Sequence, residues 1–170
     1  MDFKKYIRDI KDFPRQGIVF KDITLLLKDA EALKKVTESL FEMVKDVKID
    51  KVVGMESRGF FFAPLLAHKL NAGFVPVRKA GKLPADTISE TYSLEYGEDV
   101  LEIHLDSIKK GDKVLIHDDV LATGGTANAV CKLIERLGGE IVQCNFLIEL
   151  DFLKGKGKLN GYAVKSLLHY

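Results

Sequence analysis

The sequence predicts an α/β fold, a single domain in which a central, mainly parallel sheet is flanked by helices. The chain has 170 residues, a length that suits one domain, and 46% of them are apolar, which is enough for a sizeable core. Short apolar runs alternate with segments of helical periodicity, as in βαβ units. Short, continuously apolar runs are typical of strands in a parallel sheet that is covered by helices on both faces.

The segment before Asp29 predicts one helix and then an irregular arm. Asp2 is a favourable N-cap, and Pro14 would end the helix. The apolar residues that recur there at helical spacing are Phe3, Tyr6, Ile7 and Ile10. Pro14 and Gly17 interrupt helical structure in FPRQGIVFKDITLLL (13–27), which also holds a short β-like run at 18–20. A second helix is predicted from Asp29, where apolar residues return to one face.

Four apolar runs further along the chain predict strands. They are DKVVGME (50–56), GFVPVRK (73–79), DKVLIHDD (112–119) and EIVQCNFLIEL (140–150). Helical patterns lie between them, over residues 61–70 and over the residues that precede Gly138 and Gly139. A last strand is expected near residues 163–168.

Residues 79–106 interrupt this alternation. The segment begins with glycine, proline and polar residues and has no helical period. Leu101, Ile103 and Leu105 then alternate with polar residues, which is typical of a half-buried strand. A polar stretch inside a compact domain is usually functional, so we expect a lid over residues 80–92.

Charge and cysteine content exclude several classes of protein. The formal net charge is +1, so no global field attracts nucleic acid or an acidic membrane surface. The longest apolar stretch, residues 59–67, is far shorter than the ~20 residues of a membrane span. Cys131 and Cys144 are too few for a disulfide framework and lack metal-ligand spacing. Without a secretory leader, they indicate reduced thiols in a cytoplasmic protein.

Three polar clusters follow predicted strands: GMESRGF (54–60), VRKAGK (77–82) and HDDVLATGGT (117–126). In doubly wound sheets, ligands bind beyond the carboxyl ends of the strands, so we expect the three clusters to converge. In the third, a glycine-rich loop leads straight into a helix. Its backbone N–H groups, the helix dipole and the hydroxyls of Thr123 and Thr126 suit an anion such as phosphate.

Asp118 and Asp119 precede this loop, although carboxylates repel a bare phosphate. Two kinds of ligand would explain them. One carries a sugar with vicinal hydroxyls, from which carboxylates accept hydrogen bonds, and the other carries a Mg²⁺-bound ribose. The cluster therefore indicates a phosphorylated sugar. A capped helix N-terminus that serves stability alone is the simpler alternative.

VLIHDDVLATGGT (114–126) resembles the phosphoribosyl-pyrophosphate signature of the type I phosphoribosyltransferases. FPRQGIVFKDIT, ESRGFFFAP, RKAGKLPADT and YSLEYG also resemble segments of that family, in the same order. The resemblance runs from about Phe13 to the end of the chain. It implies one domain over residues 1–170, with an N-terminal hood at 1–28 that contributes to the base site, and a flexible catalytic loop.

The resemblance implies a site for 5-phosphoribosyl 1-pyrophosphate. Asp118 and Asp119 would bind the ribose hydroxyls and act in catalysis. The loop that would hold the 5′-phosphate consists of Ala122, Thr123, Gly124, Gly125 and Thr126. Arg58 would hold the pyrophosphate together with the backbone around Glu56 and Ser57, where family members often carry a non-proline cis peptide.

Three further cations would bring positive charge to the pyrophosphate: Arg78, Lys79 and Lys82. The two lysines would come either from this subunit or from its partner in a dimer.

The resemblance also implies a site for adenine. The purine would lie on Phe20, main-chain groups of Val19 and Lys21 would read its Watson–Crick edge, and Leu150 would cover the opposite face. Glu95 matches the proposed acid–base residue for the purine, and its neighbour Tyr96 belongs to the closing loop. The sequence departs from the family pattern at Lys21, where many members have arginine, and at Asp151, where threonine or serine is common.

The implied activity is that of a glycosyltransferase (a pentosyltransferase) of purine salvage, which converts adenine and 5-phosphoribosyl 1-pyrophosphate to AMP and pyrophosphate. The implied cofactor is Mg²⁺, held through substrate and water with no certain protein ligand. The expected assembly is a cytoplasmic homodimer that binds neither nucleic acid nor membrane. A different base, or a regulator that senses the same sugar donor and binds nucleic acid, are the alternatives; the second would need a basic face.

Several of these residues also have simpler interpretations when they are taken without the resemblance. Arg58 could be a surface arginine paired with Glu56, and Lys79 and Lys82 could be solvated loop lysines. Glu95 could be an exposed carboxylate on an alternating segment. By the same standard Phe20 belongs in the core, because aromatic side chains usually serve packing.

Overall fold

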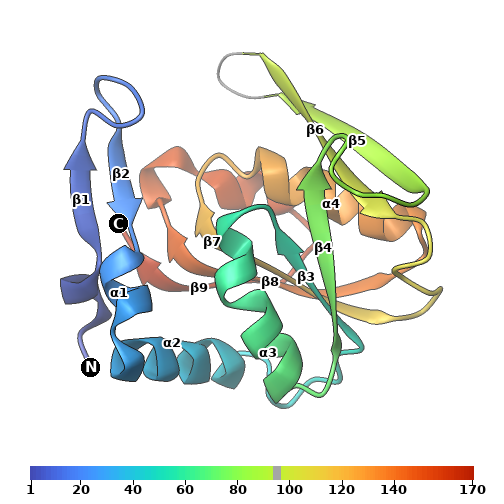
Figure 1. The fold of residues 1–170 in the computed structure, drawn as a ribbon, viewed down its shortest axis with the longest axis horizontal. Helices are drawn as coiled ribbons and strands as arrows, with labels where there is room; N and C mark the ends of the chain where they lie inside the picture. The colour runs from blue at the N-terminus through green and yellow to red at the C-terminus, as the bar shows by residue number, and fades with distance from the viewer. Residues whose placement is uncertain (94–96) are drawn as a thin grey trace. The chain divides into compact units, whose positions relative to one another are not determined.

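The computed structural model describes residues 1–93 and 97–170 and mixes helices with strands (Figure 1). The chain divides into two compact units, Met1–Ser39 and Leu40–Tyr170. In the described part of the chain, none of the helices has the length and apolar character that a bilayer span needs.

The first unit contains a two-stranded antiparallel sheet and helical segments. In chain order these are η1 (Phe3–Tyr6), β1 (Arg8–Lys11), β2 (Val19–Asp22), α1 (Thr24–Lys28) and the start of α2 (Ala30–Glu42). Asp2 caps η1 as expected, because its side chain accepts a hydrogen bond from Lys4 N at 3.2 Å. The predicted helix through Ile10 is wrong, since the chain leaves helical geometry after Tyr6.

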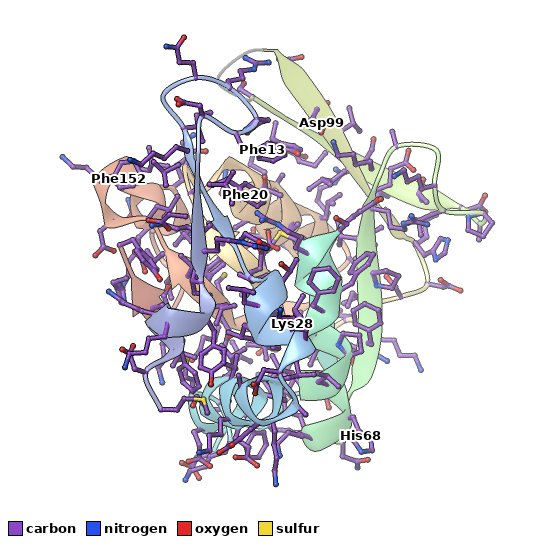
Figure 2. The ribbon with its side chains drawn as sticks, turned by 60° about the vertical axis from the view of Figure 1, so that its left-hand side comes forward. Phe13, Phe20, Lys28, His68, Asp99 and Phe152 are labelled. Atoms are coloured by element: carbon purple, nitrogen blue, oxygen red, sulfur yellow. The ribbon has the colours of Figure 1, made fainter. Side chains whose placement is uncertain are left out.

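Pairing between β1 and β2 explains that difference. Ile10 lies opposite Phe20 in the antiparallel ladder. Arg8 Nη2 also forms an ion pair with Asp22 Oδ2 at 2.6 Å. The ladder provides hydrogen-bond partners for the backbone N–H and C=O groups of both strands. A helix in place of β1 would leave those groups of β2 without these partners. The rings of Phe13 and Phe20 meet edge to face with centroids 5.1 Å apart (Figure 2).

The described residues of the second unit form a seven-stranded sheet in the order β5-β6-β4-β3-β7-β8-β9. The strands are β3 (Lys51–Met55), β4 (Gly73–Lys79), β5 (Thr87–Ser93), β6 (Glu98–His104), β7 (Lys113–Leu121), β8 (Glu140–Glu149) and β9 (Val164–His169). The five strands from β4 to β9 in this order are mutually parallel, whereas β6 is antiparallel to β4 and to β5. The predicted, mainly parallel sheet is thereby confirmed.

Helices cover both faces of this sheet. After β3 come η2 (Arg58–Phe61) and α3 (Ala63–Lys69), and α4 (Gly125–Arg136) follows β7. The chain passes from β3 to β4 in one direction across the sheet and from β7 to β8 in the other. Because parallel crossovers are right-handed, α3 and α4 must lie on opposite faces, as Figure 1 shows. The strand order reverses between β3 and β7, where such sheets bind their ligands.

Apolar side chains between α4 and the sheet form the main core. Val130 and Ile134 of α4 are fully buried, as are Val114 and Ile116 of β7. Burial of side chains of this size stabilises the fold by about 1.5–3 kcal/mol each. Cys131 is fully buried on the same helix.

The segment expected to form a lid, residues 80–92, includes regular structure that the sequence did not reveal. Residues 87–93 form the strand β5. Ile88 pairs with Ile103 and Tyr92 with Asp99 of β6, so the two strands make a hairpin at the edge of the sheet. Polar side chains alternate on the exposed face of β5, and this concealed the strand in the sequence.

Candidate active site

The three polar clusters come together at one edge of the sheet. They follow β4, β3 and β7, which are parallel neighbours, so their carboxyl ends lie side by side. Side chains connect them: Arg58 from the β3 cluster pairs with Asp119 of β7, and Glu56 from the β3 cluster pairs with Lys82 beyond β4. The structure thus builds one polar site at the reversal of strand order.

Arg58 and Asp119 form the link between β3 and β7. Arg58 Nε lies 2.9 Å from Asp119 Oδ2, and the Asp119 side chain is buried. Burial raises the pKa of Asp119, while the guanidinium of Arg58 opposes that rise. Arg58 therefore forms an ion pair with Asp119, whereas the surface interpretation supposed a pair with Glu56.

Asp118 faces a cavity of about 70 Å³. The cavity is lined by this carboxylate, by Phe146 and by loop residues that include Ala122, Thr123, Gly124 and Thr126. Asp118 Oδ1 accepts a hydrogen bond from Asp119 N at 2.8 Å. Burial, and then the negative charge of Asp119, raise the pKa of Asp118 well above its usual range.

The glycine-rich loop has the shape that the anion cradle requires. Gly124 has φ of +79°, a left-handed conformation that favours glycine, and α4 begins at the next residue. A Cβ at Gly124 would overlap the carbonyl oxygen of Gly155, at the start of η4 (Gly155–Leu159). A Cβ at Gly155 would in turn overlap the carbonyl oxygen of Ala122. The two segments therefore fix each other, and the loop lines the cavity at the N-terminus of α4, a position that suits an anion.

Glu56 gathers the cations that follow β4. Its carboxylate accepts hydrogen bonds from Lys82 Nζ at 2.5 Å, from Lys79 N at 3.0 Å and from Arg78 Nη2 at 3.4 Å. Burial by itself would raise the pKa of Glu56, but these donors outweigh it and lower the pKa to about 2. The next peptide bond, between Glu56 and Ser57, is cis, as the resemblance implies.

Asp99 is a site residue that sequence reasoning missed. It lies on β6 (Figure 2), and its Oδ2 pairs with Lys79 Nζ at 2.9 Å and accepts a hydrogen bond from Tyr92 at 3.3 Å. That pairing raises the pKa of Lys79. Burial raises the pKa of Tyr92, and its interaction with Thr126 of the cradle opposes that rise. The signal was hidden because it depends on the register of β6 with both β4 and β5.

Gly59 is a second residue whose role depends on the fold. A Cβ at this position would lie 3.0 Å from Asp118 Oδ1 and 3.0 Å from the carbonyl oxygen of His117. The glycine thus lets η2 approach the end of β7 closely, which brings Arg58 to Asp119.

The residues expected at the purine lie in both units. Val19, Phe20 and Lys21 are on β2 of the first unit, where Lys21 Nζ pairs with Asp9 at 2.7 Å. Leu150 belongs to the second unit, and its N–H donates to the carbonyl oxygen of Leu121 at 3.0 Å. Glu95 and Tyr96 lie outside the described residues.

Comparisons with known proteins bear on this site. The family model of the phosphoribosyl transferase domain matches residues 23–167. A curated adenine phosphoribosyltransferase from Christiangramia forsetii is 65% identical over 170 residues, which is all of this chain and 99% of that protein.

Solved structures agree with that match. A crystal structure of adenine phosphoribosyltransferase from Thermoanaerobacter pseudethanolicus superposes with a TM-score of 0.98 at 51% identity, over 99% of this chain and 98% of that one. The structure of the enzyme from Saccharomyces cerevisiae, complexed with adenine and an imino-altritol bisphosphate, superposes with a TM-score of 0.93 at 44% identity. The match covers 98% of this chain and 97% of that one. The chain therefore belongs to the phosphoribosyltransferase family and, within it, to the adenine phosphoribosyltransferases.

Proposed function

We propose that the site at the ends of β3, β4 and β7 converts adenine and 5-phosphoribosyl 1-pyrophosphate to AMP and pyrophosphate. The observation that carries this is a single cavity lined both by Asp118 and by the loop that leads into α4. An anion cradle beside a carboxylate suits a sugar phosphate, because the cradle takes the phosphate and the carboxylate takes the hydroxyls. The loop from Ala122 to Thr126, through Thr123, Gly124 and Gly125, holds the 5′-phosphate.

Asp118 and Asp119 act on the ribose. Transfer to N9 of adenine breaks the bond between C1′ and the pyrophosphate oxygen and leaves positive charge on the sugar ring. Carboxylates held in place beforehand stabilise such charge with little reorganisation. Arg58 keeps the Asp119 carboxylate oriented and favours its ionised form, in opposition to the effect of burial on its pKa.

The cations near Glu56 receive the leaving group. Arg58, Arg78, Lys79 and Lys82 place positive charge around the pyrophosphate, and the backbone at Ser57 contributes at the cis peptide. Mg²⁺ fits this site, since the Asp118 carboxylate lines the cavity beside the loop that leads into α4, and the ion needs few protein ligands. When Mg²⁺ is bound with the substrate, its positive charge would neutralise the leaving pyrophosphate. Asp118 and Asp119 would be the protein groups nearest the ribose.

The purine stacks on Phe20, with main-chain groups of Val19 and Lys21 at its edge and Leu150 on its other face. Glu95 manages the proton at N7 or N9 of the purine. The lid over residues 80–92, which includes most of β5, excludes water that would otherwise hydrolyse the donor.

The assembly is a homodimer in the cytoplasm. In support, Phe61 and Leu65 expose apolar side chains on η2 and α3, next to Arg58, as an interface near the site would require. The sulfurs of Cys131 and Cys144 lie 3.8 Å apart as free thiols, the state that a reducing compartment maintains. Sedimentation of the full chain and of Phe61→Asp tests the dimer, which the variant should weaken.

A base-specificity assay tests the function. The full chain, the sugar donor and Mg²⁺ are mixed with adenine, guanine, hypoxanthine or xanthine, and nucleotide formation is followed. We expect AMP from adenine and little product from the other three bases. Equal rates with an oxopurine, or no turnover with any base, would reject the proposal.

A further inference from the structure

A second cluster of metal-ligating side chains lies at the ends of β8 and β9, beyond the residues assigned to the phosphoribosyl transfer. Glu149, Asp151 and His169 each offer one ligand atom, and these atoms all lie within 4.8 Å of one another. Glu149 ends β8, His169 ends β9, and Asp151 begins η3 (Asp151–Leu153). Three segments of the chain thus bring their donors to one point.

The backbone holds these three residues in register. Glu149 and His169 are partners in the parallel ladder. Tyr170 N donates to the carbonyl oxygen of Glu149 at 3.1 Å, and Asp151 N donates to the carbonyl oxygen of Tyr170 at 2.9 Å. Because these bonds fix the backbone beside each donor, little chain entropy remains to be lost when a ligand binds.

The side chains are oriented as well. Glu149 is 7% exposed, and its Oε2 accepts a hydrogen bond from Ser166 Oγ at 2.7 Å. Outer hydrogen bonds of this kind orient a ligating carboxylate in known metal sites. Asp151 and His169 are exposed and lie in contact, with Asp151 Oδ1 2.9 Å from His169 Nδ1. The cluster therefore has one buried, anchored carboxylate and an open side through which an ion can enter.

The donor set selects the class of ion. Two carboxylates and an imidazole are the oxygen and nitrogen ligands of Mn²⁺, Co²⁺ and Zn²⁺, whereas Mg²⁺ takes oxygen ligands almost exclusively. Ligands bonded at about 2.0–2.2 Å lie at most about 4.4 Å apart, so a cluster within 4.8 Å needs a shift of only a few tenths of an ångström.

We propose that Glu149, Asp151 and His169 form a binding site for a divalent transition-metal ion, distinct from any Mg²⁺ that enters with the sugar donor. The ion would join β8, β9 and η3, and so tie together the segments on either side of Leu150. The proposal does not depend on the reaction at Asp118 and Asp119, which lie on β7.

Metal titration of the full chain tests this proposal. The protein is freed of metal with a chelator and titrated, without substrates, with Mn²⁺ by electron paramagnetic resonance and with Zn²⁺ against a chromophoric chelator. We expect one site, which Asp151→Asn and His169→Gln each weaken about tenfold or more, since even outer-sphere partners contribute 10–100-fold. Both positions are exposed, so the variants should fold, and circular dichroism checks that they do.

Two control variants separate this site from other metal ligands. His68→Gln alters an exposed histidine on α3, far from Phe152 in Figure 2, and should bind metal as the unaltered chain does. The double variant Asp118→Asn/Asp119→Asn should also keep the ion. The proposal is overturned if the chain binds neither ion more tightly than about 1 mM. It is equally overturned if Asp151→Asn and His169→Gln bind as the unaltered chain does, or if the Asp118/Asp119 variant alone abolishes binding.

Discussion

Arg58 Nε lies 2.9 Å from Asp119 Oδ2, and this ion pair joins the segment after β3 to the end of β7. The two strands are neighbours at the point where the strand order reverses. The pair therefore spans the position where an α/β sheet of this kind binds its ligand. It also keeps a buried carboxylate beside a cation, which limits the cost of its burial.

Asp119→Asn should lower kcat for AMP formation by about 10²–10³-fold, the range found when one preorganised electrostatic group is removed from a transition state. The amide keeps the shape of the side chain but loses the charge that pairs with Arg58 and that, in the proposed reaction, faces the sugar. A coupled assay for AMP at saturating substrates measures the effect. Asp106→Asn, at an exposed position after β6, is the matched control and should keep full activity. A rate for Asp119→Asn within twofold of the control's would contradict the role of Asp119.

Gly124→Ala should destabilise the fold by about 1–3 kcal/mol and raise KM for the sugar donor. The added methyl group meets the carbonyl oxygen of Gly155, and φ of +79° is unfavourable for alanine. Urea unfolding gives the stability, and initial rates give KM. Gly157→Ala is the control, because a Cβ there meets nothing within 4 Å. Equal stability of the two variants would show that the loop is not confined as described.

Glu56 should make stability depend on pH in the acid range. Its pKa is lowered from 4.5 to about 2 in the folded chain, so it binds fewer protons than in the unfolded chain. Its contribution is therefore complete above pH 4.5 and is lost as the pH falls from there towards 2. It amounts to on the order of 2–3 kcal/mol.

Urea unfolding of the unaltered chain and of Glu56→Gln, at pH 7, 4 and 3, measures this contribution. The difference in unfolding free energy should be largest at pH 7 and shrink at each lower pH. Glu98→Gln, at an exposed position on β6, reports the background dependence of the chain. A difference that stays constant or grows on acidification would refute the inferred shift.

Lys82→Ala should raise KM for the sugar donor about tenfold while KM for adenine changes little. In the proposed site the lysine supplies one of the charges for the pyrophosphate, and the loss of one charge-assisted hydrogen bond corresponds to about 1.5 kcal/mol. Lys34→Ala, which removes an exposed lysine of α2, matches the change in net charge and should leave both constants unaltered. Parallel rises in both KM values would point to a general disturbance instead of a pyrophosphate contact.

Much of the sheet could be predicted because its central strands carry their own signal. β3, β4, β7 and β8 are short apolar runs, and their burial on both faces makes them readable without knowledge of their partners. β1 and β5 could not be read in this way. Ile7 and Ile10 fit a helical spacing equally well, and only pairing with β2 decides against it. β5 has polar alternation that resembles a loop until β6 lies beside it.

The same distinction applies to the site. The convergence of the clusters around Arg58, Arg78 and Asp118 follows from strand ends in a parallel sheet, so local sequence patterns were enough to expect it. The contact between Lys79 and Asp99 depends on the register of an antiparallel pair, and the approach of Gly155 to Gly124 depends on where η4 packs. Such contacts join segments far apart in the chain, and no local pattern encodes them.

The cluster around Glu56 also bears on how the reaction ends. A pyrophosphate group that binds Arg78 and Lys82 must compete with a carboxylate that already occupies their donors. The net attraction between these cations and the product is reduced, because the new contacts with pyrophosphate replace existing contacts with Glu56. In the proposed reaction, the same carboxylate would re-engage the cations after the product leaves, as in the contacts seen here. If Arg78 and Lys82 bind the pyrophosphate as proposed, Glu56 is an internal counter-anion that favours its release.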